Sequence, residues 1–180
     1  MNTEEIWTIG HSNKAFETFL DCLQSQRIEL LADVRRFPGS RRYPHFGAEA
    51  LAQSLRTAGI AYAHYPELGG HRPTQPDSPN DAWRNSAFRG YADYMMTRDF
   101  IDAIERLMET ALKKRTAMMC AEALWWQCHR SLIADYLKAR GWRVWHILTT
   151  TKIEEHPFSS AARIVDGQLT YASQDRLTGL

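Results

Sequence analysis

Short apolar runs alternate with amphipathic segments along most of this chain. Five runs have the length and apolar content of buried strands, at residues 6–9, 28–34, 60–65, 117–120 and 142–148. Between them, apolar residues recur at helical spacing in four segments, at residues 16–23, 48–58, 88–115 and 132–137. Strands that alternate with helices in this way favour a parallel sheet covered by helices on both faces.

The alternation predicts a three-layer α/β fold with a mainly parallel, five-stranded sheet. Because crossovers between parallel strands are right-handed, few topologies remain, and we expect a Rossmann-like sheet with the strand order 3-2-1-4-5. An Asp-Gly pair between two short apolar runs in residues 163–171 predicts a short C-terminal hairpin. Ser12 or Asn13 is suited to cap the first helix, and Thr97 to begin a second helix within the segment 88–115.

One stretch interrupts the alternation. Residues 73–86 contain three prolines and few apolar residues, which is typical of a loop. A chain of 180 residues is long enough for one domain with a substantial core and short for two. We therefore interpret residues 1–180 as a single α/β domain and residues 73–86 as an irregular excursion from it.

The composition gives little information about the cellular compartment of the protein or the class of its binding partners. The formal net charge is +1, so any preference for nucleic acid has to come from local clustering of charge. No apolar run has the length of a membrane span, the first ten residues lack a signal-peptide pattern, and three cysteines do not make a disulfide framework in a chain of this size. We expect a cytoplasmic protein with reduced thiols and no membrane partner.

The most suggestive polar residues follow the first, second and fourth predicted strands. They lie in three loops, at residues 10–13, 33–36 and 120–130. In open α/β sheets, ligands bind outside the carboxyl ends of the strands, at the point where the strand order reverses. With strands one and four as neighbours, we expect these loops to form one crevice at that edge of the sheet.

The loop after the second predicted strand is rich in arginine. Its arginines are Arg35, Arg36, Arg41 and Arg42. No acid occurs from Val34 to Ala48, and Tyr43, His45 and Phe46 add aromatic surface. Guanidinium groups match phosphate oxygens, and aromatic rings stack on bases. The loop therefore indicates contact with a phosphate-bearing small molecule or nucleic acid, although a solvated basic loop that pairs with acids elsewhere explains the same pattern.

Residues 116–137 hold two of the three cysteines. Cys128 precedes a predicted helix, and His129 and Arg130 follow it. This setting stabilises a thiolate, which makes a nucleophile or a redox-active thiol, but a small buried side chain in the first helical turn fits equally well. Cys120, at the end of an apolar strand, is more typical of the core. Cys120 and Cys128 could nevertheless approach each other and form a reversible disulfide.

Two familiar kinds of site are not supported by the residue spacing. In cysteine phosphatases an arginine follows the catalytic cysteine by six residues, whereas Trp126 and Ala134 occupy these positions. Neither a CxxC pair nor an HxxxH pair occurs, which argues against zinc. GHSN at residues 10–13 resembles an anion-binding turn before a helix, but it matches neither glycine-rich phosphate motif. The sequence predicts no metal and does not identify a cofactor.

Glu122 is the acid nearest to the cysteines. A carboxylate directly after a buried strand costs free energy unless it is paired, and Arg130, Arg35 or His11 could pair with it. As a functional group it could be a general base, a nucleophile or an acceptor for a ribose hydroxyl. His11 is a candidate for acid–base chemistry or simply a residue of the turn.

Four blocks of the sequence resemble one known family. They are TIGHSN, ADVRRFPGSRRYPHF, the pattern LGG-x-R at residues 68–72 and CAEALWWQCHRSLIADYL, and they lie within residues 7–137. In this order they resemble the bacterial and archaeal family catalogued as domain of unknown function number 488. The resemblance implies a single-domain α/β protein without an established reaction. It also implies a shared set of motif residues: His11, Ser12, Asn13, Asp33, Arg35, Pro38, Ser40, Pro44, Phe46, Gly69, Gly70, Arg72, Cys120, Glu122, Cys128, His129 and Arg130.

The leading hypothesis is an enzyme that acts on a nucleotide or nucleic acid in the predicted crevice. Its candidate catalytic residues are Glu122, Cys128, His11 and Cys120. Its candidate anion-binding residues are Ser12, Asn13, Asp33, Arg35, Arg36, Arg41, Arg42, Arg72, His129 and Arg130. One alternative is a non-catalytic module that binds nucleic acid or a nucleotide, and a further alternative is a thiol redox sensor.

Overall fold

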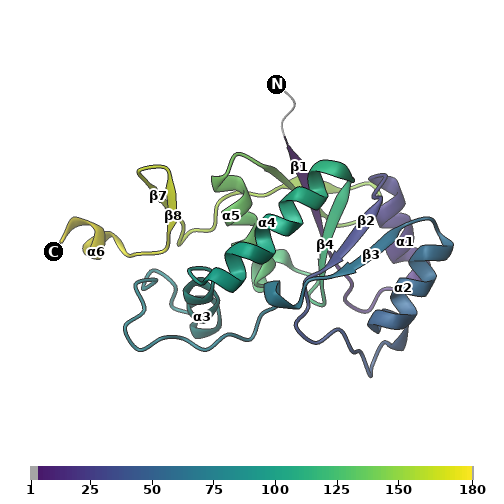
Figure 1. Cartoon of the computed structure of the whole chain (residues 1–180), viewed down its shortest axis with the longest axis horizontal. Helices are drawn as coiled ribbons and strands as arrows, with labels where there is room; N and C mark the ends of the chain where they lie inside the picture. Colours follow the sequence, from purple (N-terminus) through teal and green to yellow (C-terminus); the bar gives the residue numbers. More distant parts are fainter. Residues whose placement is uncertain (1–3, 180) are drawn as a thin grey trace.

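A computed structural model describes residues 4–179 of the chain (Figure 1). The strands are β1 (Glu5–Gly10), β2 (Leu30–Asp33), β3 (Ala61–His64), β4 (Thr116–Cys120), β5 (Arg143–Ile147), β6 (Ile153–Glu155), β7 (Arg163–Val165) and β8 (Gln168–Thr170). The α-helices are α1 (Phe16–Ser25), α2 (Ala48–Thr57), α3 (Ser86–Tyr94), α4 (Arg98–Lys113), α5 (Arg130–Ala139) and α6 (Gln174–Thr178). None of these helices combines the length and the apolar content that a bilayer crossing requires.

A six-stranded, mostly parallel sheet forms the centre of the protein. Its strand order is β3-β2-β4-β1-β5-β6, and only β6 runs antiparallel to its neighbour. Helices α1 and α2 lie on one side of the sheet and α3, α4 and α5 on the other (Figure 1). The antiparallel pair β7–β8 makes a separate hairpin. The predicted α/β class, with its mainly parallel sheet and short hairpin, is confirmed.

The predicted order 3-2-1-4-5 is wrong in the middle of the sheet, and the predicted number of strands is one too low. β4 lies between β2 and β1 and pairs with both. Every residue of β4 and nearly every residue of β1 is buried, so the apolar pattern does not tell which strand is central. β6 is three residues long and includes two acids, so no apolar run reveals it. Its place in the sheet comes from backbone pairing with β5.

Two apolar cores, one on each face of the sheet, hold the layers together. On the face of α4, Phe100, Ala103, Ile104 and Leu107 are fully buried and follow the spacing i, i+3, i+4, i+7 of a helical stripe. Burial of one large apolar side chain contributes about 1.5–3 kcal/mol. On the opposite face the core includes Phe19, Leu23, Leu31, Leu51 and Leu55.

Side-chain capping explains the N-terminus of α4 but not that of α1. Thr97 Oγ1 accepts a hydrogen bond from the Phe100 backbone N–H at the start of α4, as predicted. The prediction that Ser12 or Asn13 caps α1 is wrong, because the N-cap is Ala15 and no side chain caps the helix. The reason is tertiary: the His11 and Ser12 backbone N–H groups bond to the carbonyls of Cys120 and Ala121, which holds this segment beside the loop after β4.

Residues 69–85 contain neither helix nor strand. The buried carboxylate of Asp93 on α3 fastens this segment, because it accepts hydrogen bonds from the Gln75 backbone N–H, the Ser78 hydroxyl and the Asn80 amide. Three hydrogen bonds to one charged acceptor hold the irregular segment against α3. The segment therefore has a defined path, which brings Gly70 and His71 to the edge of the sheet.

Candidate functional site

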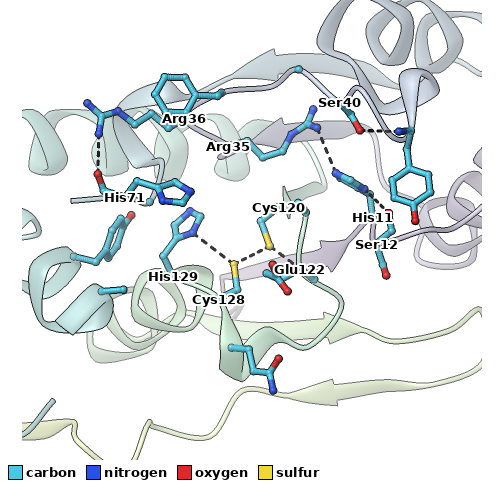
Figure 2. A pocket seen from close by; sticks show the side chains of 18 of the residues that line it. His11, Ser12, Arg35, Arg36, Ser40, His71, Cys120, Glu122, Cys128 and His129 are labelled. Carbon is cyan, nitrogen blue, oxygen red and sulfur yellow. Dashed lines mark hydrogen bonds between the residues drawn. The ribbon is translucent and has the colours of Figure 1, made fainter. Parts of the chain in front are cut away.

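The carboxyl ends of β1, β2 and β4 meet at a cavity of about 640 Å³ (Figure 2). The neighbouring strands β1 and β4 are followed by helices on opposite faces of the sheet, α1 on one and α5 on the other. Open α/β sheets bind ligands at such a point. Pockets for small molecules commonly have volumes of ~300–1,000 Å³. The cavity is thus large enough for a ligand of nucleotide size.

The three loops that the sequence predicts to converge do meet around this cavity. His11 N–H donates to the Cys120 carbonyl at 3.0 Å, and Val34 N–H donates to the Met119 carbonyl at 3.0 Å. Because β4 lies between β2 and β1, the cysteine loop lies between the two other loops. Figure 2 shows Cys120, Cys128 and Glu122 in the middle of the cavity, with His11 and Ser12 toward one end and His71 toward the other.

Nine of the fourteen candidate residues line the cavity. They are His11, Ser12, Asn13, Arg35, Arg36, Cys120, Glu122, Cys128 and His129. The other five are Asp33, Arg41, Arg42, Arg72 and Arg130. Of these, Asp33 and Arg130 are buried, whereas Arg41 and Arg42 are exposed. Whether any of the fourteen binds or transforms a ligand remains a prediction.

Arg72 does not line the cavity and instead holds residues 66–69 in place. Its guanidinium group donates to the backbone carbonyls of Gly69, Pro66 and Glu67. The same group lies over the Tyr94 ring, 3.7 Å from its centroid, which adds a cation–π contact. These contacts use its donors to hold the turn that carries Gly70.

Asp33 holds Arg35 against the wall of the cavity. Arg35 Nε donates to Asp33 Oδ1 at 2.9 Å and Nη2 donates to Oδ2 at 2.7 Å, a bidentate pair with side chains 7% and 0% exposed. The Tyr62 hydroxyl also donates to Asp33. Arg35 Nη1 lies 3.4 Å from His11 Nε2 on the side of the cavity. The pair therefore presents a guanidinium group in a fixed orientation.

Cys128 lies within contact distance of a thiol and an imidazole. Its Sγ is 2.8 Å from Cys120 Sγ and 3.5 Å from His129 Nδ1. His129 Nε2 is 3.1 Å from the Val34 carbonyl oxygen. Because a carbonyl can only accept, Nε2 carries the proton, and Nδ1 is left as an acceptor that faces the Cys128 sulfur. A thiol, a neutral imidazole and a group that orients the imidazole are the parts of an activated nucleophile.

The pKa values of the Cys120 and Cys128 thiols are shifted in opposite directions. Burial raises the pKa of the Cys120 thiol well above its ordinary value. Burial alone would also raise the pKa of Cys128, but the hydrogen bond between its thiol and that of Cys120, the charge of Arg130 and the Arg130 backbone N–H together lower it. Cys128 is thus the more acidic thiol and the better nucleophile at neutral pH.

Two of the histidines of the cavity wall, His11 and His129, are neutral. Desolvation by burial lowers the pKa of His129 below its ordinary value. Burial and the nearby charge of Arg35 lower the pKa of His11 to about 4, although its hydrogen bond to the Ser12 carbonyl acts in the opposite direction. At neutral pH each ring therefore offers one unprotonated nitrogen, as a general base requires.

Glu122 is exposed, so the expectation that its carboxylate is buried and costly after β4 is wrong. Within residues 4–179, Glu122 forms no ion pair with Arg130, Arg35 or His11. Water can solvate this carboxylate, so its position in the chain needs no functional explanation. Glu122 does line the cavity beside the two sulfur atoms (Figure 2), which keeps it available as a base.

A further wall of the cavity is not indicated by the hydrophobic pattern. It comes from residues 70–71 and from Ala87, Phe88 and Tyr91 of α3. A Cβ atom at Gly70 would lie 3.0 Å from His129 Nδ1, and one at Gly69 would lie 2.5 Å from the Arg36 backbone. The adjacent glycines therefore permit the close packing of this wall, and the glycine pair is the signal in the sequence that could have revealed it.

A family model described as "Domain of unknown function DUF488" matches residues 15–137. The match includes the arginine loop, the glycine pair and the cysteine segment, and it begins just after the GHSN turn. A search of curated proteins and a search of solved structures each found no match. Because the match covers more than half of the chain, the protein belongs to the DUF488 family.

Proposed function

We propose that this protein is an enzyme that binds a phosphate-bearing ligand in the cavity and attacks it with Cys128. The observation that carries the proposal is the contact of Cys128 Sγ with His129 Nδ1, a nitrogen left unprotonated because Nε2 donates to the Val34 carbonyl. In the attack, the Cys128 proton passes to His129 Nδ1 as the sulfur bonds to an electrophilic phosphorus or carbon atom. The bond from that atom to its leaving group breaks, and the leaving group takes the proton from His129 as it departs. Glu122 is the second acid–base group.

The phosphate-bearing ligand is argued from the charges of the cavity wall. Arg35 is immobilised by Asp33. Arg36 donates to the His71 carbonyl at 2.8 Å and is otherwise exposed, so its remaining N–H donors can bind an anion. Ser12 and Asn13 add polar side chains at the opposite end. A nucleotide fits both this arrangement and the cavity volume.

The proposed binding of a phosphate-bearing ligand is tested by calorimetry. The probes are inorganic phosphate, the adenosine 5′-phosphates and a short single-stranded oligonucleotide. We expect Arg36→Ala to weaken binding about tenfold, since a charged hydrogen bond contributes about 1.5–3 kcal/mol. Arg41→Ala is the matched control, because Arg41 lies in the same loop but not on the cavity wall. Equal effects of the two substitutions, or no binding of any probe, would contradict the phosphate site.

The catalytic part is tested with the same probes under reducing conditions. Cys128→Ser and Glu122→Gln should retain binding and lose turnover, and the intact mass of the wild-type protein should show a covalent adduct on Cys128. Unchanged turnover in Cys128→Ser would refute the nucleophile. Binding that neither substitution changes, without turnover in the wild type, would instead identify a non-catalytic binding module.

A further inference from the structure

Cys120 and Cys128 form a close pair, and the third cysteine, Cys22, lies elsewhere in the fold. Their Sγ atoms are 2.8 Å apart, and both side chains line the cavity although they are only 2% and 4% exposed. Cys22 is also buried, but it belongs to the core on the opposite face of the sheet. The fold therefore selects one pair of thiols and leaves Cys22 as an internal control.

The segment that joins the pair can accommodate a small movement. Residues 121–124 are exposed and without helix or strand, followed by a single 3₁₀ turn at Trp125–Gln127. A disulfide has a sulfur–sulfur distance of ~2.05 Å, so the two sulfur atoms need to approach by less than ~1 Å. An exposed loop can absorb such a shift more readily than β4 or α5 can.

Arg130 supplies an uncompensated positive charge behind the pair. Its side chain is 2% exposed, and Nη2 donates to the Ala123 carbonyl at 3.1 Å. Within the described part of the chain, Nε and Nη1 have no hydrogen-bond partner, and no carboxylate forms an ion pair with this group. A buried guanidinium group without a counter-ion is costly. A thiolate or another anionic sulfur species at Cys128 would provide the missing charge.

The pair is chemically asymmetric. The lowered pKa of Cys128 and the raised pKa of Cys120 assign the two roles that disulfide formation requires. The thiolate is the species that attacks an oxidant, and the neighbouring thiol then resolves the product. His129 Nδ1 lies beside the attacking sulfur and can accept its proton.

We propose that Cys128 and Cys120 are a redox-active dithiol, with Cys128 as the thiol that reacts with a hydroperoxide and Cys120 as the resolving thiol. The Cys128 thiolate attacks the outer peroxide oxygen, the O–O bond breaks, and the released alkoxide or hydroxide takes up a proton to leave as alcohol or water. Cys128 becomes a sulfenic acid, having given two electrons to the peroxide. The Cys120 sulfur then attacks Cys128, the S–O bond breaks, and the hydroxide leaves as water with the Cys120 proton.

This dithiol would also regulate the proposed enzyme. The disulfide consumes Cys128, so oxidation removes the nucleophile and reduction restores it. That consequence rests on the proposed function, whereas the formation of the disulfide does not. Thiol chemistry can be followed without any substrate, so failure of one proposal is distinguishable from failure of the other.

The test uses the reduced full chain, hydrogen peroxide as the probe and a chelator that removes trace metals. After quenching and alkylation of the remaining thiols, peptide mass spectrometry without reduction should show a Cys120–Cys128 linked peptide that has lost two hydrogen atoms, with Cys22 alkylated. Cys22→Ala should give the same product. Free thiols at both positions, or a linkage that includes Cys22, would overturn the proposal.

The order of the two cysteines is tested with single variants. In Cys120→Ala, dimedone should trap a sulfenic acid on Cys128, whereas Cys128→Ala should leave Cys120 reduced. Trapping on Cys120 with Cys128 intact would reverse the assignment and overturn it. Arg130→Met should slow the reaction of Cys128 about tenfold, equivalent to one pKa unit, and should raise the thiol pKa measured by ultraviolet thiolate absorbance. Arg130→Lys should restore both, which a purely structural role would not predict.

Discussion

Two clusters of side chains that each include histidine lie on the same face of the sheet, and only one of them opens into a cavity. The open cluster contains Cys120, Cys128 and His129. The enclosed cluster is a chain of hydrogen bonds that runs from Thr8 on β1 through His146 and His156 to Asp135 on α5. Both clusters contain histidine, so the presence of an imidazole ring by itself does not explain a difference in chemistry.

In the enclosed cluster every ring nitrogen has a partner. Thr8 Oγ1 lies 2.6 Å from His146 Nδ1, His146 Nε2 lies 2.9 Å from His156 Nδ1, and His156 Nε2 lies 2.8 Å from Asp135 Oδ1. Each ring nitrogen in this chain can pair with its neighbour as a hydrogen-bond donor or acceptor, and the chain ends on the Asp135 carboxyl group. Burial and the neighbouring His156 lower the pKa of His146. All four side chains are at most 1% exposed.

The hydrogen bonds of the enclosed network leave none of its ring nitrogens without a partner, whereas Arg130 in the open cluster has donors without a partner among the described residues. Asp135 also accepts from the Tyr171 hydroxyl and the Ser159 backbone N–H, so the network ties the C-terminal segment to α5. The open cluster instead has a thiol with a lowered pKa, an unprotonated imidazole nitrogen and a guanidinium group with unmet donors. Unmet groups of this kind mark functional sites more often than fully paired ones do.

The largest expected effect comes from breaking the enclosed network with Asp135→Ala. Two buried donors, on His156 and Tyr171, and the partly buried Ser159 N–H lose their acceptor. Because an unpaired buried donor costs about 1–3 kcal/mol, we expect the free energy of unfolding in urea to fall by about 4 kcal/mol. Asp102→Ala is the control, because its ion pair with Arg98 is exposed and should contribute less than ~1 kcal/mol. Alkylation of Cys128 in the folded variant should keep its wild-type rate. A changed rate would show that the two clusters are coupled.

A smaller loss of stability is expected from Gly10→Ala, because Gly10 packs against the loop that follows Cys120. A Cβ atom at Gly10 would overlap the Glu122 carbonyl oxygen and lie 2.9 Å from Arg130 Nη1. Overpacking of this kind costs about 1–3 kcal/mol, and the displaced loop should also change the alkylation rate of Cys128. Gly39→Ala is the matched control, since nothing lies within 4 Å of its Cβ position. Equal free energies of unfolding for Gly10→Ala and Gly39→Ala in urea would contradict the close packing around Gly10.

The smallest effect concerns pH and the histidines of the cavity wall. Burial lowers the pKa of His11 from 6.5 to about 4, so the unfolded chain takes up a proton below pH 6.5 while the folded protein does not. Stability is therefore lost as the pH falls from 6.5 to about 4. Allowing for screening by water in the cavity, we expect His11→Gln to remove about 1–2 kcal/mol of the difference in unfolding free energy between pH 7.5 and 5.

The control for this measurement is Ser12→Ala, which changes the same turn without removing a titrating group. It should keep the full pH dependence of the wild type. His129 and His146, whose pKa values are also lowered, should produce the dependence that remains in His11→Gln. An unchanged pH dependence in His11→Gln would contradict a neutral, buried His11.

Much of the site could be placed from the sequence, because it depends on where strands end. Polar residues that follow buried strands identified three of the cavity walls, including His11, Arg35 and Cys128. The hydrophobic pattern did not indicate the wall around Gly70, because residues 69–85 have no periodicity and are held by Asp93 from another part of the chain. It also gave the wrong reason for Glu122, since exposure depends on how the loop folds and not on the strand before it.

What the sequence by itself determined is local: the helices with an apolar stripe, the hairpin at Asp166 and Gly167, and the start of α4 at Thr97. In each case the residues that form the signal lie within a few positions of one another, so the pattern contains them. The tertiary structure alone decided the central place of β4, the contact between the sulfur atoms of Cys120 and Cys128, and the hydrogen-bond chain from Thr8 to Asp135. These features depend on contacts between separate elements, whose relative positions follow from the free energy of packing the whole chain.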